Sequence, residues 1–180
     1  MQKVINLFGG PGTGKSTTAS GLFYVLKRMG INCELISEYA KDKTWEENAA
    51  TLKCQEYIFG KQQYRMHRVS GKVEFIVTDA PLLLSTLYIP EDYPLPSLKQ
   101  TVREAYQSYD NFNVFLVRKK EYQSAGRRQT EEEARELDED TRKMLDAFEV
   151  PYHVVDADES AVLTILRLLF PGRELPVFMV

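Results

Sequence analysis

The sequence predicts a three-layer α/β fold with about five parallel strands and helices on both faces of the sheet. Three observations lead to this prediction. Short apolar runs alternate with amphipathic stretches along the chain, as parallel strands alternate with crossover helices. A glycine-rich loop joins the first run to the first amphipathic stretch, and 180 residues with 43% hydrophobic content suffice for one core. We therefore expect a single domain over residues 1–180.

The first strand is expected at residues 4–8, and it leads into residues 9–16, which read GGPGTGKS. This octapeptide fits the P-loop pattern G-x-x-x-x-G-K-[ST] at every fixed position. Residues 17–29 follow with apolar side chains at helical spacing. Strand, loop and helix are in the order of a P-loop NTPase fold. The complete pattern disfavours the alternative, a glycine-rich turn that only joins a strand to a helix. The sequence thus predicts ATP as a cofactor at this loop.

Each part of the loop has an expected contact with ATP. Backbone N–H groups freed by the glycines would face phosphate oxygens. Lys15, expected in a solvated loop, would reach the β- and γ-phosphates, and the Ser16 hydroxyl would bind Mg²⁺. The residues predicted to contact the nucleotide are Gly10, Gly12, Thr13, Gly14, Lys15, Ser16, Thr17 and, from a later segment, Arg118.

The second unit begins after Gly30, with a short strand expected at 33–36. Residues 37–42 would form a loop at the end of that strand. A long helix, with a break allowed in its middle, is expected from about Trp45 to Val69, ended by Gly71. A third strand at 74–78 places Asp79 at its carboxyl end, which is the Walker B arrangement. Asp79 would hold Mg²⁺ through water or act as the base, and the alternative is a turn residue before Pro81.

The remaining elements are predicted from prolines, which interrupt helices, and from helix-capping residues. Pro81 would open a short helix, and residues 89–96 contain three prolines and should be irregular. A helix over 97–109 and a strand over 112–117 would follow. The polar, basic segment at about 118–130 reads as a lid, and Thr130 with Glu133 forms a capping box. The helix that follows would end before Pro151, with a strand at 152–155 and a last helix from Asp158.

Composition excludes several classes of protein. No apolar run reaches the length of a membrane span, and we expect a cytoplasmic protein without a membrane partner. The two cysteines and two histidines are isolated, and the net charge of −3 does not suit overall polyanion binding. The guanine-reading N-K-x-D motif is absent from the sequence. A small-molecule kinase is favoured, since its needs are a nucleotide cradle, an acid near the acceptor and arginines over the transferred group.

Four segments resemble small kinases related to the nicotinamide riboside kinase domain, and more closely the bacteriophage P-loop proteins usually labelled AAA-type ATPase or kinase. The segments are FGGPGTGKST at 8–17, EYAKD at 38–42, TDAPLL at 78–83 and AGRRQT at 125–130. Some phage members phosphorylate 5-hydroxymethyluracil in DNA, so the resemblance implies host cytoplasm and this acceptor as the best specific expectation. The riboside kinases carry Asp-Gly-x-Arg in the lid, which leaves open which arginine acts here.

The resemblance also implies roles for individual residues. Glu38 matches the carboxylate that faces the acceptor hydroxyl in nucleoside kinases, as base or hydroxyl aligner. The alternatives for Glu38 are an exposed loop carboxylate or a salt bridge to Lys41, and Asp42 is the next candidate for the role. Arg127 and Arg128, together with Arg118, are candidates for neutralising phosphoryl charge as a lid closes.

A basic stripe is the one feature suited to a polynucleotide. Its members follow helical spacing, with tyrosines nearby for base stacking: Lys61, Arg65, Arg68 and Lys72, with Tyr57 and Tyr64. Glu38, Asp42, Tyr57, Lys61 and Arg65 are thus the predicted substrate contacts. An ordinary solvated face is the alternative. The acceptor is a base in DNA, a free nucleoside or a nucleotide, and the other function class is a regulatory, partner-activated ATPase.

Overall fold

A computed structural model describes residues 2–119, 121–123 and 129–175. Its centre is a five-stranded sheet in the order β2-β3-β1-β4-β5, with every neighbouring pair parallel. The strands are β1 (Lys3–Phe8), β2 (Cys33–Ile36), β3 (Phe75–Thr78), β4 (Asp110–Val117) and β5 (His153–Asp156). The central position of β1 places the loop that follows it in the middle of one sheet edge. The predicted five-stranded parallel sheet is confirmed.

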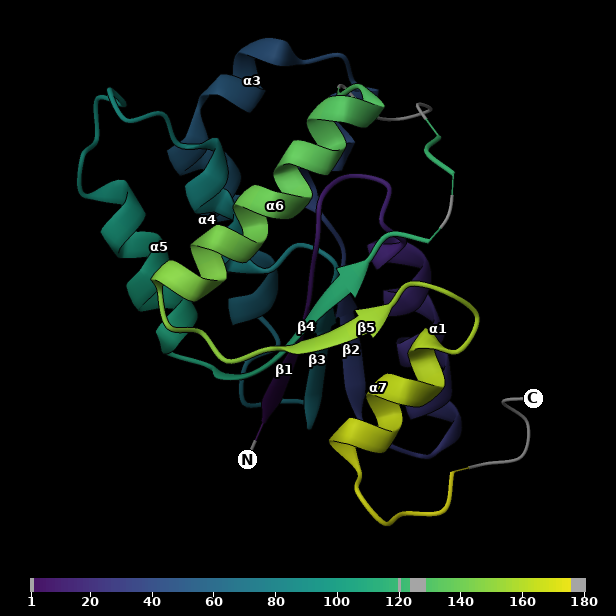
Figure 1. Cartoon of the computed structure of the whole chain (residues 1–180). Coiled ribbons are helices and arrows are strands. Elements are labelled where there is room, and N and C mark those ends of the chain that lie inside the picture. The colour runs from purple at the N-terminus through teal and green to yellow at the C-terminus, as the bar shows by residue number, and fades with distance from the viewer. Residues whose placement is uncertain (1, 120, 124–128, 176–180) are drawn as a thin grey trace.

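Helices cover both faces of the sheet (Figure 1). One face carries α1 (Lys15–Arg28) and α7 (Ala161–Leu169). The opposite face carries α4 (Gln55–His67), the 3₁₀ helix η1 (Leu82–Tyr88), α5 (Leu98–Gln107) and α6 (Glu131–Ala147). Because side chains alternate along a strand, β1 contributes to both layers. Its Ile5 and Leu7 pack with α1 and α7, and its Val4 and Phe8 pack with the opposite layer.

The helical segment expected from Trp45 to Val69 is broken between Lys53 and Gln55, as the prediction allowed, but its bounds differ. The segment forms α2 (Tyr39–Trp45), α3 (Ala49–Lys53) and α4. Glu47 adopts a left-handed φ of 53°, and the Asn48 side chain accepts a hydrogen bond from the Thr51 N–H, which starts a new helix. Trp45, which ends α2, is 64% exposed. Helix α2 begins inside the predicted loop, so Glu38 becomes its N-cap residue.

Other boundaries differ less. The capping box of Thr130 and Glu133 forms as predicted and starts α6. The last helix begins at Ala161 rather than at Asp158. The carboxylate of Asp158 accepts hydrogen bonds from the backbone N–H and the hydroxyl of Ser160, so Asp158 belongs to the turn that precedes the helix.

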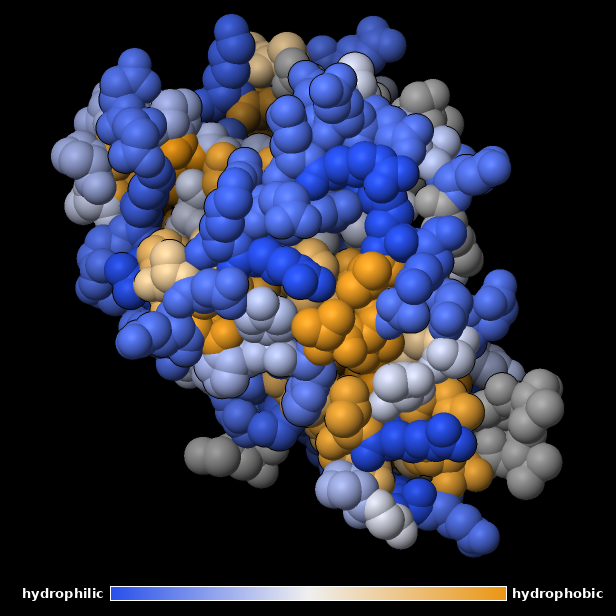
Figure 2. All heavy atoms as spheres, viewed as in Figure 1, coloured by the Kyte–Doolittle hydropathy of each residue, from blue (hydrophilic) through white to orange (hydrophobic). Residues whose placement is uncertain are grey.

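Figure 2 shows that the surface over α6 is hydrophilic and that apolar surface gathers lower on this face, over β5 and α7. The exposed apolar side chains there include Val154 on β5 and Leu168 on α7. In the described part of the chain, no helix combines the length and apolar character that crossing a membrane would require.

Candidate active site

The candidate site lies where β1, β2 and β3 end. Because parallel strands present their carboxyl ends at one edge, the P-loop after β1 meets Glu38 after β2 and Asp79 after β3. These segments share a cavity of about 360 Å³ that Lys15, Ser16, Glu38 and Asp79 all line. The structure thus brings together the P-loop and both acids that the sequence had placed at the strand ends.

The P-loop is held close to α6. Gly14 is the N-cap of α1 with a left-handed φ of 105°, a conformation that glycine adopts without strain. At Gly10, a Cβ would lie 2.4 Å from the carbonyl oxygen of Ala134, so only glycine fits between the loop and the helix. The N-terminus of α1 lies at the cavity, which Gly14, Lys15, Ser16 and Thr17 line, and a helix N-terminus is a favourable place for phosphate.

Lys15 folds back onto its own loop. Its ammonium donates to the carbonyl oxygens of Gly9 and Gly10 at 2.7 and 2.9 Å. The side chain is half-buried, so it is less solvated than the sequence suggested. Desolvation lowers the pKa of Lys15, while the carboxylates of Glu38 and Asp79 oppose that shift. A phosphate would offer the ammonium better acceptors than two neutral carbonyl groups.

Ser16 and Asp79 form the pair that fits a magnesium ion. The Ser16 hydroxyl donates to Asp79 Oδ2 at 2.5 Å, and Asp79 Oδ1 accepts from the Glu38 N–H at 3.1 Å. The Asp79 side chain is 5% exposed, so its orientation is fixed. Mg²⁺ prefers oxygen ligands and takes few of them from protein, completing its octahedron with phosphate oxygens and water. A hydroxyl and a carboxylate beside a phosphate cradle suit that requirement.

Glu38 is the acid that faces the cavity. Desolvation raises the pKa of its carboxyl group, the Lys15 ammonium opposes the shift, and Asp79 adds to it. Asp42, the alternative, accepts a hydrogen bond from Arg65 Nη2 at 2.6 Å and has a 49% exposed side chain. Asp42 is not among the cavity residues. Geometry therefore favours Glu38 over Asp42 as the group near an acceptor.

Part of the cavity has apolar walls, and this part is called the apolar compartment below. These walls come from four residues on α3, α4 and the start of η1: Leu52, Ile58, Pro81 and Leu84. Polar groups interrupt them at Gln62, Ser85 and Tyr88. Desolvation and the neighbouring Glu38 carboxylate raise the pKa of Tyr88, so its phenol stays protonated. Sequence reasoning missed this compartment, because its residues come from separate elements with no common spacing.

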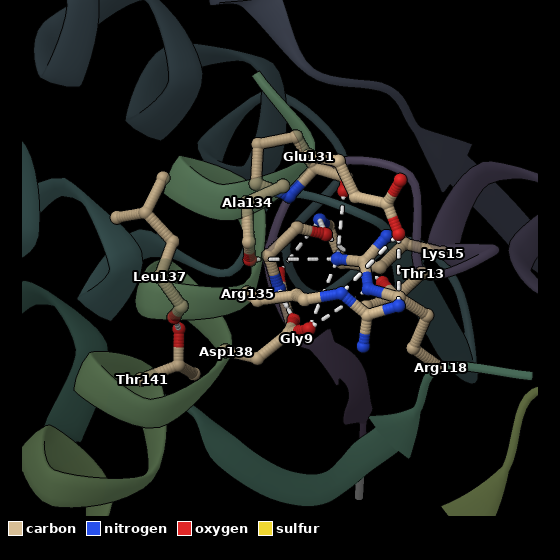
Figure 3. A network of polar contacts seen from close by, with 12 residues as sticks. Gly9, Thr13, Lys15, Arg118, Glu131, Ala134, Arg135, Leu137, Asp138 and Thr141 are labelled. Atoms are coloured by element: carbon tan, nitrogen blue, oxygen red, sulfur yellow. Dashed lines mark hydrogen bonds and ion pairs between the residues drawn. The ribbon is translucent and has the colours of Figure 1, made fainter. Parts of the chain in front are cut away.

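Arg118 belongs to a network behind the P-loop (Figure 3). Its Nε donates to Asp138 Oδ2 at 3.0 Å and its Nη2 donates to the Pro11 carbonyl at 2.8 Å. Asp138 Oδ1 accepts from the Gly10 N–H at 2.6 Å. The side chain of Arg118 is 6% exposed. Arg118 thus supports the phosphate loop, together with an aspartate that sequence reasoning missed. Asp138 is one acid in a helix rich in acids, and nothing in the sequence distinguishes it.

We expect Asp138→Ala to lower the free energy of unfolding by about 1–3 kcal/mol, because the Gly10 N–H and the Arg118 guanidinium lose their acceptor. Affinity for ATP should fall about tenfold as the loop loosens, which corresponds to about 1.4 kcal/mol. Urea unfolding and calorimetric ATP titration measure the two effects. Glu139→Ala, at an exposed position of the same helix, is the control. Equal behaviour of the two variants would contradict the role of Asp138.

The other predicted substrate residues lie outside the cavity lining. The Lys61 ammonium sits 5.3 Å from the Tyr57 ring centroid, and the Arg65 guanidinium sits 5.0 Å from that of Tyr39. Helix α4 ends at His67, so the continuous four-residue stripe is wrong: Arg68 is the C-cap residue and Lys72 lies beyond the helix. Arg127 and Arg128 fall outside the described residues.

The sequence pattern of a family described as AAA domain matches residues 4–161. Among curated proteins, no sequence matches the chain. A solved NadR protein in complex with NR is 18% identical with a TM-score of 0.74, and the alignment covers 97% of this chain and 53% of that chain. A NadR protein in complex with NAD and AMP-PNP is 17% identical with a TM-score of 0.70, over 97% and 51% of the two chains.

The deoxyadenosine kinase from M. mycoides with bound dATP is 18% identical with a TM-score of 0.53, over 92% of this chain and 98% of that chain. The chain spans about half the length of the NadR chains. At these identities the likeness shows a shared fold and no more. Since the family pattern covers most of the sequence, the chain belongs to the AAA domain family.

Proposed function

We propose that the protein is an ATP-dependent kinase that transfers the γ-phosphoryl group of ATP to a hydroxyl of a nucleoside-type acceptor. The observation that carries this proposal is the lining of the cavity. Lys15 and Ser16 of the P-loop, the Glu38 carboxylate and the residues of the apolar compartment all line one cavity. A site for hydrolysis alone needs room only for water.

Glu38 would act on the acceptor. Its carboxylate accepts the proton of the acceptor hydroxyl as that oxygen bonds to the γ-phosphorus, and the bond from this phosphorus to the β-γ bridging oxygen breaks, which releases ADP. The raised pKa of Glu38 makes it a stronger base than an exposed glutamate while leaving it ionised at sufficiently high pH.

The P-loop end of the cavity would hold and neutralise the triphosphate. Lys15 would exchange its two carbonyl acceptors for phosphate oxygens, and the backbone N–H groups at the start of α1 would bind others. Ser16 would hold Mg²⁺ directly and Asp79 would hold it through water, and the ion when bound supplies charge neutralisation of the phosphates. Asp79 also fixes the backbone of Glu38 through the Glu38 N–H, so one carboxylate positions both ends of the site.

The apolar compartment suits a planar base. Leu52, Ile58 and Leu84 offer flat aliphatic surface, and binding compartments of this kind combine such walls with a few orienting polar groups. The ligands bound in the similar structures, NR in a NadR protein and dATP in a deoxyadenosine kinase, support a nucleoside-type ligand here.

The test is transfer of labelled γ-phosphate to a panel of acceptors: uridine, thymidine, cytidine, adenosine, guanosine, nicotinamide riboside, the corresponding nucleotides, and DNA that contains 5-hydroxymethyluracil. The proposal expects label in at least one acceptor. Label found only in inorganic phosphate would instead favour the partner-activated ATPase.

The narrower proposal is 5-hydroxymethyluracil in DNA as the acceptor. Its structural support is limited to Lys61 and Arg65, the two members of the predicted stripe that lie on α4, and Arg65 is paired with Asp42. If a strand binds along α4, replacing Arg65 and Arg68 together by Ala should weaken DNA binding and lower its salt slope by up to about 2. Fluorescence anisotropy at several salt concentrations measures this. A parent protein that does not bind DNA at low salt contradicts the narrower proposal and leaves free nucleosides.

A further inference from the structure

One buried donor in the cavity wall, the side-chain NH₂ group of Gln62, has no partner in the part of the chain that the structure describes. Gln62, on α4, is 5% exposed and lines the cavity. Its Oε1 accepts a hydrogen bond from the Tyr39 N–H at 2.9 Å. Its Nε2 is buried and has no hydrogen-bond partner among the residues that the structure describes. Leaving such a donor unpaired is costly, and most buried polar groups are paired.

The orientation of the amide is fixed by its one bond. A backbone N–H can only donate, so the side-chain oxygen must face Tyr39 and the NH₂ group must point elsewhere. A rotated amide would place two donors against each other. Gln62 therefore cannot satisfy its NH₂ group by turning, and the position of this donor is set by the backbone at the start of α2.

That backbone also carries the carboxylate of the site. Tyr39 follows Glu38 directly, and the Glu38 N–H donates to Asp79. The Gln62 amide is thus anchored one residue from Glu38 and lines the same cavity. Tyr88 lines the cavity as well, and the Glu38 carboxylate contributes to the raised pKa of its phenol. A ligand that presents a hydroxyl to Glu38 would therefore have Gln62 beside it.

We propose that Gln62 binds the acceptor directly, and that its Nε2–H₂ group donates to an acceptor atom of the nucleoside near the hydroxyl that is phosphorylated. This inference rests on the proposed function and specifies the acceptor further. The ligand must carry a hydrogen-bond acceptor at that place, either the oxygen of a second sugar hydroxyl or a carbonyl oxygen or ring nitrogen of the base. Gln62 would bind the ligand and not take part in the proton transfer.

The decisive variant is Gln62→Glu. A glutamate keeps an oxygen for the Tyr39 N–H and replaces the NH₂ group by a second acceptor, so the structural bond survives and the donated bond is lost. Gln62→Met has a side chain of nearly the same length and removes both the bond accepted from the Tyr39 N–H and the bond donated to the ligand. The controls are Gln63→Glu and Gln63→Met, which make the same changes one residue along α4 at a half-buried position that does not line the cavity.

Each protein is assayed with the nucleoside of the panel that the parent phosphorylates fastest. Gln62→Glu and Gln62→Met should lower kcat/KM for that nucleoside roughly 10- to 100-fold, mainly through KM for the acceptor. KM for ATP should stay within about twofold, and the Gln63 variants should match the parent. Analogues that lack one sugar hydroxyl or one acceptor atom of the base then identify the atom that Gln62 contacts. The analogue that lacks this atom should have a lower kcat/KM than the nucleoside with the parent protein, and the same kcat/KM as the nucleoside with Gln62→Met.

The remaining outcomes overturn the inference in distinguishable ways. If the parent is active and Gln62→Glu matches Gln63→Glu, the role of Gln62 is wrong and the proposed function stands. If Gln62→Glu raises KM for ATP as much as KM for the acceptor, Gln62 acts on the structure of the site and not on the acceptor. If the parent phosphorylates no nucleoside in the panel, the proposed function fails first and the assignment of Gln62 fails with it.

Discussion

Lys15→Ala is expected to reduce phosphoryl transfer by about 10³-fold or more, because a positioned cation at the developing phosphate charge is among the strongest contributions in a site of this type. Affinity for ATP should also fall. The fold should persist, since within the described residues the Lys15 ammonium donates only to carbonyls of its own loop and its burial lowers the pKa of its amine. Labelled-phosphate assays, ATP titration and circular dichroism test these points together.

Lys53→Ala is the matched control, because Lys53 is an exposed lysine at the end of α3 that does not line the cavity. It should behave as the parent does in all three measurements. A Lys15→Ala variant with full activity would contradict the kinase assignment. A Lys15→Ala variant that does not fold would show that the hydrogen bonds of Lys15 to its own loop are needed for the stability of the fold.

Glu38→Gln is expected to lower kcat by about 10²- to 10⁴-fold with little change in ATP binding, because glutamine keeps the shape and loses the proton acceptor. The parent should also lose activity as pH falls through the raised pKa of Glu38, since only the ionised carboxylate accepts a proton. This acid limb should begin at a higher pH than for an ordinary glutamate, and it should be absent from Glu38→Gln.

The contrast with Asp79→Asn assigns the roles of the two acids. That variant should shift the Mg²⁺ dependence of the rate, since Asp79 pairs with Ser16. If Glu38→Gln reacted at the normal rate and Asp79→Asn no longer lost activity at low pH, the two roles would be exchanged. Asp79 would then be the proton acceptor.

Local sequence signals predicted the parts of the site that lie next to strands. The P-loop, Glu38 and Asp79 follow apolar runs directly, and the carboxyl ends of parallel strands meet at one edge whatever the details of the helices. The capping box at Thr130 was equally local, since both of its hydrogen bonds join residues three apart. These features needed no knowledge of long-range packing.

The features that depend on contacts between distant residues were not predictable in this way. Asp138 lies 128 positions from Gly10 in the chain, and only the packing of α6 on the P-loop brings them together. The break at Glu47 depends on a single left-handed residue, which periodicity does not register. Gln62 reads as one polar residue on an amphipathic helix, and its importance follows from its burial and its unpaired nitrogen.

The central claim is that this site delivers the γ-phosphoryl group to a hydroxyl of a nucleoside and not to water. The most direct measurement is the amount of ADP and of phosphorylated nucleoside formed in the same reaction, followed over time. The account predicts equal amounts of the two products, at a rate that rises with acceptor concentration to saturation. Steady formation of ADP with no phosphorylated acceptor, at a rate independent of every acceptor added, would contradict it.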